Sequence, residues 1–313
     1  MSLQLQSLES TPPALIASSL KNVGLSLDYG ACTVRIVAPH TGFETSLKTV
    51  YGAFDFIENP EFSDFHINLQ RGSKIRRYIR PTVHFQIDGI RPFDPFPLSN
   101  ALPLYEWGIN WCFAQRFNQY ILLHAGTLAQ GNKGIVMAAV PGSGKSTLSA
   151  AMMLRGFRLL SDEFGVLDPA TGGLLPMLKP IALKNQSIDI IRFFSDSASL
   201  GTTFVGTKKG DVAHLGPDRP SVIARHQAAT PALIIFPRYE DGAKLTLTLQ
   251  SPDLAFSRLA FNSFNYALLG PISFTAVAAL AARCPAYELR YSQLDEAVNC
   301  LRDLVANTHT NDV

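Results

Sequence analysis

Short runs of β-branched and aromatic residues recur through the first hundred residues of the chain. Residues 33–38 (TVRIVA) and 82–87 (TVHFQI) are two such runs, each bounded by turn-forming residues, and this pattern is typical of β-strands. Prolines then crowd together near residues 92–103, which indicates a connection between two parts of the chain. We therefore predict a smaller β-rich N-terminal domain over residues 1–100, whose role the sequence does not indicate, and a second domain over residues 101–313.

The second domain opens on a helical pattern between residues 104 and 119. Apolar residues, three of them aromatic, recur there at helical spacing: Leu104, Trp107, Trp111, Ala114 and Phe117. Because such a stripe usually forms the packed face of a helix, we expect these side chains to lie in the core rather than to bind a cofactor.

The central segment alternates strands with a helix. Residues 121–129 (ILLHAGTLA) and 135–140 (IVMAAV) have the apolar character of buried strands and are separated by a glycine-containing turn. Residues 146–155 (STLSAAMMLR) are rich in helix formers, and Gly156 stands where glycine commonly ends a helix. Residues 157–160 predict another short strand.

The remainder of the chain continues to alternate. We predict helices at residues 187–194, 254–269, 273–282 and 294–305, and strands at residues 231–236, 244–249 and 286–291. The first two of these strands are expected to form a hairpin around Glu240-Asp241-Gly242. Strands mixed with helices throughout this half predict an α/β domain.

The strongest chemical signal is the run A-V-P-G-S-G-K-S-T at residues 139–147. It fits the phosphate-loop pattern G-x-x-x-x-G-K-[ST], except that alanine replaces the first glycine. Gly142 and Gly144 permit positive φ, so successive N–H groups can face inward, and the helix that follows directs its positive dipole end to the same point. We therefore predict that Lys145 reaches the β- and γ-phosphates of a nucleoside triphosphate and that Ser146 binds Mg²⁺. The predicted nucleotide-binding residues are Gly142, Ser143, Gly144, Lys145, Ser146 and Thr147.

Two acidic residues, Asp162 and Glu163, directly follow the predicted strand at 157–160. A carboxylate at the end of a strand beside a phosphate loop is well placed to bind magnesium or to accept a proton from an attacking hydroxyl. We assign the catalytic base to Asp162 and metal binding to Glu163, with both carboxylates and Ser146 as candidate magnesium ligands. The alternative is a solvated pair of acids at a strand end.

Three further sets of residues are weaker candidates. If the two central strands form a hairpin centred near Asn132, His124 pairs with position 140 and lies beside the phosphate loop. There it can orient Asp162 or contact the γ-phosphate. The alternative is that His124 is a buried core histidine. Lys208 and Lys209 stand in a glycine-containing loop that can close over the phosphates or the acceptor, although a solvated loop would look the same. The weakest set is cationic and consists of Lys179, Lys184 and Arg192.

Composition and charge narrow the class of protein. Lys plus Arg number 27 and Asp plus Glu 25, a net charge of +2, which gives no electrostatic reason to expect nucleic acid or an acidic membrane as a partner. The four cysteines are far apart in the sequence, which favours free thiols in a reducing compartment. The N-terminal residues lack the pattern of a signal peptide, and no apolar stretch is long enough to span a membrane. We expect a cytoplasmic protein that forms a homo-oligomer.

Several of these runs resemble a known family. Residues 124–126 (HAG), the phosphate loop and residues 155–163 (RGFRLLSDE) resemble, in order and spacing, the catalytic domain of bacterial HPr kinase/phosphorylase, which carries two aspartates where this chain has Asp-Glu. Later runs resemble the HPr-related kinase A group, and with them the resemblance extends from about residue 95 to residue 300. These later runs lie at residues 183–185 (LKN), 209–210 (KG), 212–215 (VAHL) and 261–266 (FNSFNY).

The resemblance implies a phosphate-loop kinase domain of the type shared by HPr kinase and phosphoenolpyruvate carboxykinase. It implies ATP and Mg²⁺ as ligands and phosphoryl transfer to a hydroxyl, with His124, Lys145, Ser146, Asp162 and Glu163 at the functional positions. The acceptor is then a serine of a protein or peptide. Two alternatives stay open, namely a kinase for a small-molecule alcohol and a nucleotide-binding regulator without turnover.

Overall fold

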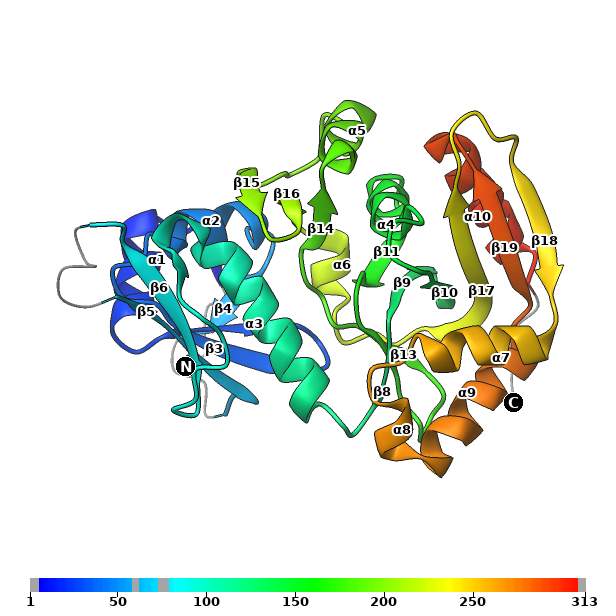
Figure 1. The fold of residues 1–313 in the computed structure, drawn as a ribbon, viewed down its shortest axis with the longest axis horizontal. Helices are drawn as coiled ribbons and strands as arrows, with labels where there is room; N and C mark the ends of the chain where they lie inside the picture. Colours follow the sequence, from blue (N-terminus) through cyan, green and yellow to red (C-terminus); the bar gives the residue numbers. More distant parts are fainter. Residues whose placement is uncertain (1–5, 58–61, 73–78, 309–313) are drawn as a thin grey trace.

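The computed structural model of the chain describes residues 6–57, 62–72 and 79–308. Residues 1–5, which contribute to the expectation that the chain has no signal peptide, lie outside the described residues. The fold is mixed α/β, and Figure 1 shows a sheet with its helices at one end of the molecule and a larger α/β part at the other. Within the described ranges, none of the helices combines the length and the apolar character needed to cross a bilayer.

The first part is built on a mixed sheet with strand order β1-β4-β2-β3-β5-β6-β7. Its strands are Gln6–Ser7 (β1), Leu25–Asp28 (β2), Thr33–Val37 (β3), Asp55–Ile57 (β4), Phe65–Arg71 (β5), Thr82–Ile87 (β6) and Phe96–Pro97 (β7). Only β3 and β5 pair in parallel among these described strands. Every second residue of β3 and β6 is buried, so one face of the sheet packs on the core. The two strands predicted in this region are therefore confirmed.

Three helices and a short 3₁₀ turn accompany this sheet. They are Pro13–Lys21 (α1), Phe43–Val50 (α2), Leu98–Asn100 (η2) and Ala101–Arg116 (α3). Helix α3 was predicted to open the second domain, but it packs on the sheet of the first part. At Gly108 it approaches β6 so closely that a Cβ atom there would lie 2.0 Å from the ring of Phe85.

The second part is built on a sheet with strand order β11-β9-β10-β17-β19-β18. Its strands are Ala125–Gln130 (β9), Lys133–Ala138 (β10), Arg158–Ser161 (β11), Thr230–Tyr239 (β17), Thr246–Gln250 (β18) and Ala286–Tyr291 (β19). The central strands β10, β17 and β19 run parallel, and the flanking strands pair antiparallel. Strands buried on both faces need continuous apolar sequence, which β10 has.

Helices cover both faces of this sheet, as Figure 1 shows. They are Lys145–Leu154 (α4), Pro252–Phe261 (α7), Pro271–Arg283 (α9) and Leu294–Ala306 (α10). Ile135 and Met137 of β10 belong to the same apolar cluster as the buried residues of α4 and α10. Val136 and Ala138, which point to the opposite face, belong to a second cluster with α7 and α9.

The chain also forms two small three-stranded sheets. One has the order β13-β12-β8, with Ile121–Leu123 (β8), Gly165–Leu167 (β12) and Leu174–Leu175 (β13). The other has the order β14-β16-β15, with Ile181–Lys184 (β14), Phe204–Thr207 (β15) and Gly210–Leu215 (β16). The remaining helices are Gln186–Phe194 (α5), Arg219–Ile223 (α6) and Tyr266–Leu269 (α8).

The segment at 121–129 is two strands, not the one strand predicted. Residues 121–123 pair with β12, whereas 125–130 pair with β10, so the chain passes from one sheet to another at His124. The main-chain N–H of His124 donates to the carbonyl oxygen of Asn262 at 2.5 Å. The hairpin register was therefore wrong by one position: Ala138 faces Ala125, and His124 lies just outside the ladder.

Two more predictions fail because distant segments intervene. The strands β17 and β18 do not form a hairpin, since β19 lies between them and pairs with both. The single helix predicted at 254–269 is divided into α7 and α8. Between them, the Asn265 side chain accepts from the Leu122 N–H at 3.0 Å and donates to the Tyr120 carbonyl oxygen at 2.8 Å, which binds this turn to β8.

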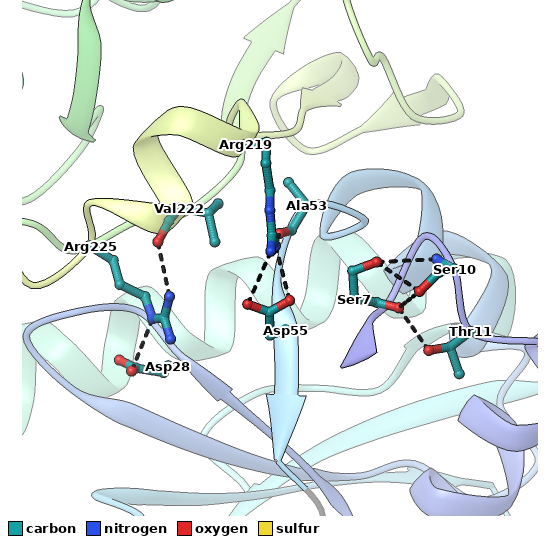
Figure 2. A network of polar contacts seen from close by, with 9 residues as sticks. All are labelled: Ser7, Ser10, Thr11, Asp28, Ala53, Asp55, Arg219, Val222 and Arg225. Atoms are coloured by element: carbon teal, nitrogen blue, oxygen red, sulfur yellow. Dashed lines mark hydrogen bonds and ion pairs between the residues drawn. The ribbon is translucent and has the colours of Figure 1, made fainter. Parts of the chain in front are cut away.

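The two parts are joined by main-chain and ionic contacts. Gly30 lies so close to the second part that a Cβ atom there would be 2.3 Å from the carbonyl oxygen of Arg225. Figure 2 shows two arginines at α6 reaching acids of the first part: Arg225 Nε lies 3.0 Å from Asp28 Oδ2, and Arg219 Nη1 lies 3.0 Å from Asp55 Oδ1. The junction therefore holds the first part, with α3 packed on its sheet, against the second part.

Candidate functional site

The phosphate-loop motif lies between the end of β10 and the start of α4. Gly142 and Gly144 have φ values of 86° and 87°, in the left-handed region that glycine reaches without steric cost. Gly144 is the N-cap of α4, so the unpaired N–H groups of the first turn of the helix lie at the loop. The strand–loop–helix arrangement and both positive φ angles are as the sequence predicts. Gly156, predicted to end this helix, follows it with φ 93°.

The loop is held against the ends of β17 and β19. The Tyr239 N–H donates to the Ser143 carbonyl oxygen at 2.9 Å, and the Tyr291 hydroxyl donates to the Gly144 carbonyl oxygen at 3.3 Å. A Cβ atom at Gly144 would lie 2.7 Å from the Tyr291 hydroxyl oxygen. Glycine is therefore required at this position both for its φ angle and for space.

The structure brings Lys145 and Asp162 together. Asp162 follows directly after β11, and its Oδ1 lies 3.5 Å from Lys145 Nζ, which also donates to the Asp162 carbonyl oxygen. The two side chains are 10% and 8% exposed, so the pair is largely shielded from water. Gly126 of β9 allows the strand to approach α4 closely, because a Cβ atom there would lie 2.7 Å from Ser149 Oγ of α4. The structure therefore places the acidic residue beside the loop lysine, at the strand end where the sequence predicted it.

Glu163 is held by a residue of the first part. Its Oε2 accepts a 2.5 Å hydrogen bond from the Asn110 Nδ2 amide of α3. Ser146, Asp162 and Glu163 all line the same cavity and offer a hydroxyl and two carboxylates, the hard oxygen ligands that Mg²⁺ accepts. Among the described residues, no cluster of three or more His, Cys, Asp or Glu side chains is arranged to bind a metal ion. A magnesium ion shared with phosphate oxygens needs only one or two carboxylates, so the donor set fits.

His124 lies at the turn between β8 and β9 and lines the same cavity. Its ring packs against Phe264, with the centroids 5.3 Å apart. Burial lowers the pKa of His124, and the nearby Lys145 ammonium lowers it further. The imidazole is therefore favoured in its neutral form, which can accept a proton or a hydrogen bond at one nitrogen.

One cavity of about 1370 Å³ connects these residues. Its lining includes the phosphate loop, His124, Asp162, Glu163, Lys179, Lys184, Lys208, Lys209 and His214. Small-molecule sites commonly occupy roughly 300–1,000 Å³, so this cavity has room for more than one ligand. Arg192, from the weaker cationic set, does not line it; its guanidinium pairs instead with Asp189 at 2.7 Å on the surface of α5.

Lys208 and Lys209 stand at the turn between β15 and β16. Lys209 Nζ lies 4.8 Å from the ring centroid of Trp107, a cation–π arrangement, and partial burial lowers the pKa of Lys209. Trp107 was predicted to lie in the core, but it lines the cavity and packs edge-on against Phe96. The first part of the chain therefore supplies an aromatic wall of the site.

Sequence reasoning missed the polar residues of α3 and the tyrosines that hold the loop. Glu106 and Asn110 interrupt an otherwise mainly apolar helix one turn apart, and this interruption was the signal that could have identified them. Tyr239 and Tyr291 carried no comparable signal, because tyrosine at a strand end is common. Lys179, placed in the weakest set, is 8% exposed and forms an ion pair with Glu106 at 3.1 Å.

Comparison with known proteins adds little. The chain matches neither a protein-family model nor a curated protein. Among solved structures it is similar to the Hpr(Ser) kinase/phosphatase from Coxiella burnetii, at 13% sequence identity, with 59% of this chain and 94% of that chain covered and a TM-score of 0.25. A TM-score this low supports no inference about the site or the reaction of this chain.

Proposed function

We propose that the protein is an ATP- and magnesium-dependent kinase that transfers the γ-phosphate to a hydroxyl acceptor, a serine of a protein or peptide. The observation that carries this proposal is the loop between β10 and α4. It combines two glycines at positive φ with Lys145, whose ammonium lies 3.5 Å from Asp162 Oδ1 in the wall of the cavity that the loop also lines. The motifs that resemble HPr kinases point to the same class of reaction.

The loop and Lys145 bind the triphosphate in this proposal. The N–H groups at the first turn of α4 and the positive end of the helix dipole attract the phosphate oxygens, and the Lys145 ammonium neutralises charge on the transferring group. Ser146, Glu163 and Asp162 hold Mg²⁺. The ion stabilises negative charge on the β- and γ-phosphate oxygens when it is bound.

Asp162 is the proposed base. The acceptor hydroxyl oxygen forms a bond to the γ-phosphorus, the bond from that phosphorus to the β,γ-bridging oxygen breaks, and ADP leaves with the electron pair. The hydroxyl proton passes to the Asp162 carboxylate. His124, neutral because burial lowers its pKa, contributes a hydrogen bond to the phosphoryl group or to Asp162.

A second candidate is a kinase for a small-molecule alcohol. The observation that favours it is that Lys208, Lys209 and His124 line the same cavity as the phosphate loop, as a site for a small anionic acceptor would require. The third possibility, a nucleotide-binding regulator without turnover, keeps the loop but needs no base.

The test is transfer of labelled γ-phosphate from ATP to host lysate separated into protein and small-molecule fractions. We expect Lys145→Ala to abolish transfer. We expect Asp162→Asn to keep ATP affinity within about tenfold, which is about 1.4 kcal/mol, while product formation collapses. Lys244→Ala and Asp253→Asn, which change exposed residues away from the cavity, serve as matched controls. The fraction that carries the label separates the two acceptor classes.

Undiminished transfer by Lys145→Ala would refute the assigned site, and full turnover by Asp162→Asn would remove Asp162 as the base. Wild-type protein that binds ATP but labels neither fraction would favour the regulator.

A further inference from the structure

A chain of buried polar groups runs from the core of the first part to Glu163. The Tyr29 hydroxyl bonds to the Tyr105 hydroxyl at 2.6 Å and donates to the Tyr51 hydroxyl oxygen at 3.1 Å. The Tyr51 hydroxyl in turn donates to Glu106 Oε1 at 2.6 Å. All three tyrosines are fully buried. Burying a polar group costs free energy unless the group is hydrogen-bonded. The hydrogen bonds between these tyrosines and Glu106 therefore stabilise the polar groups inside this core.

The ion pair at the centre of the chain leaves Lys179 no free donor. Its ammonium has three N–H groups, and three acceptors surround it: Glu106 Oε2 at 3.1 Å, the Glu106 carbonyl oxygen at 3.5 Å and Asn110 Oδ1. The side chains of Lys179 and Glu106 are 10% and 5% exposed. Although Lys179 lines the cavity, its ammonium therefore donates to acceptors on α3 and is not available to bind a phosphate.

This arrangement fixes the orientation of the Asn110 amide. An asparagine side chain can place either its oxygen or its NH₂ group toward a neighbour. Because Lys179 donates to Oδ1, the NH₂ group faces Glu163, where it donates to Oε2 at 2.5 Å. Without Lys179, the amide could turn its oxygen toward the carboxylate, and the two oxygens would repel each other.

We propose that Asn110 is a positioning residue for Glu163: Lys179, held by Glu106, orients the amide so that it anchors one carboxylate oxygen and leaves the other for magnesium. No donor among the described residues is bonded to Oε1 of Glu163, which suits that task. The inference rests on the proposed function, because anchoring the Glu163 carboxylate affects activity only if magnesium and nucleotide bind in this cavity. Mg²⁺ requires near-ideal octahedral geometry, so a carboxylate held in one orientation binds it better than a mobile one.

The proposal gives the first part of the chain a role in the site. Glu106 and Asn110 lie on α3, one helical turn apart on the same face, and α3 packs on the first sheet. The position of Glu163, which lies in the turn between β11 and β12, is therefore set from across the junction and not by that turn alone.

The test is Asn110→Asp, with Asn299→Asp on the exposed surface of α10 as the matched control. The introduced carboxylate still accepts from Lys179 but repels Glu163, so the chain stays folded while the anchor is lost. Binding of a non-hydrolysable ATP analogue is measured with and without magnesium, alongside phosphate transfer and thermal unfolding. We expect the magnesium-dependent gain in analogue binding to fall about 10- to 100-fold, with binding in the absence of magnesium unchanged and a single cooperative thermal transition retained.

A second variant keeps the test decisive if Asn110→Asp does not fold. Glu106→Gln combined with Lys179→Met removes both buried charges together, so neither is left unpaired, and it frees the Asn110 amide to rotate. We expect the same loss of magnesium dependence. If either variant folds and its analogue binding depends on magnesium as strongly as that of the wild type, the positioning role is overturned while the kinase proposal stays intact. Wild-type protein that shows no magnesium-dependent ATP binding would overturn both.

Discussion

At the residue scale, buried ionisable side chains differ in whether their polar atoms are hydrogen-bonded. Lys179 and Glu106 satisfy each other, whereas His214, 2% exposed on β16, has no hydrogen-bond partner for Nδ1 among the described residues. Burial lowers the pKa of His214 from its ordinary value of 6.5, since the charged form loses its hydration. His214 is therefore a neutral group in the folded protein at pH values where an exposed histidine begins to bind a proton.

This difference predicts a loss of stability in mild acid. The folded-state pKa of His214 lies below the unfolded value near 6.5, so the unfolded chain binds the proton first as the pH falls. The free energy of unfolding is unaffected above that value and decreases as the pH drops from about 6.5 toward the folded pKa. We expect His214→Gln to make urea-unfolding free energies less dependent on pH between 7 and 5. His66→Gln, which changes an exposed histidine of β5, is the control; equal pH slopes for wild type and His214→Gln would contradict the prediction.

At the scale of elements, the phosphate loop depends on strands remote in sequence. Its carbonyl oxygens at Ser143 and Gly144 accept from Tyr239 at the end of β17 and Tyr291 at the end of β19. The parallel strands end at one edge of the sheet, and ligands of open α/β sheets bind at that edge. The loop is thus held by the sheet and not only by its own glycines.

We therefore expect Gly144→Ala to destabilise the protein more than Gly156→Ala. Both glycines have φ near 90°, so each substitution costs about 1–2 kcal/mol for placing a side chain in the left-handed region. At Gly156 the added Cβ atom meets open space, whereas at Gly144 it would lie 2.7 Å from the Tyr291 hydroxyl oxygen and 3.0 Å from Tyr239 Cβ. Urea unfolding of the two variants measures the difference, and equal losses would show that the loop is not held by these tyrosines.

At the scale of the whole molecule, the two parts share one core. A single apolar cluster includes buried residues of the first sheet, of α3 and of the α4 face of the second sheet. Polar contacts add to it just after α6, where Asp28 Oδ2 lies 3.0 Å from Arg225 Nε and 2.8 Å from His226 Nε2. We infer that the parts fold as one cooperative unit.

The junction can be tested with Asp28→Asn. The side chains of Asp28 and Arg225 are 14% and 15% exposed, and a hydrogen bond to a charged group contributes roughly 1.5–3 kcal/mol, so we expect a loss of that order. Asp189→Asn, which breaks an exposed pair with Arg192 on α5, should cost less than about 1 kcal/mol. Chemical denaturation followed by circular dichroism and tryptophan fluorescence checks both values. Two separate transitions, with only one affected by Asp28→Asn, would show that the parts unfold independently.

The sequence by itself determined the local elements and the backbone conformation of the loop between β10 and α4. The strands at β3, β6 and β10, the helix α4 and the positive φ at Gly142 and Gly144 follow from residue periodicity and from glycine, whose effects act within a few neighbouring positions. Only the tertiary structure decided which distant segments meet. It inserted β19 between β17 and β18, turned the chain at His124, and brought Asn110 to Glu163. Such pairings depend on packing between segments far apart in the chain, and the local pattern of residues does not encode which distant segment packs against a given strand or helix.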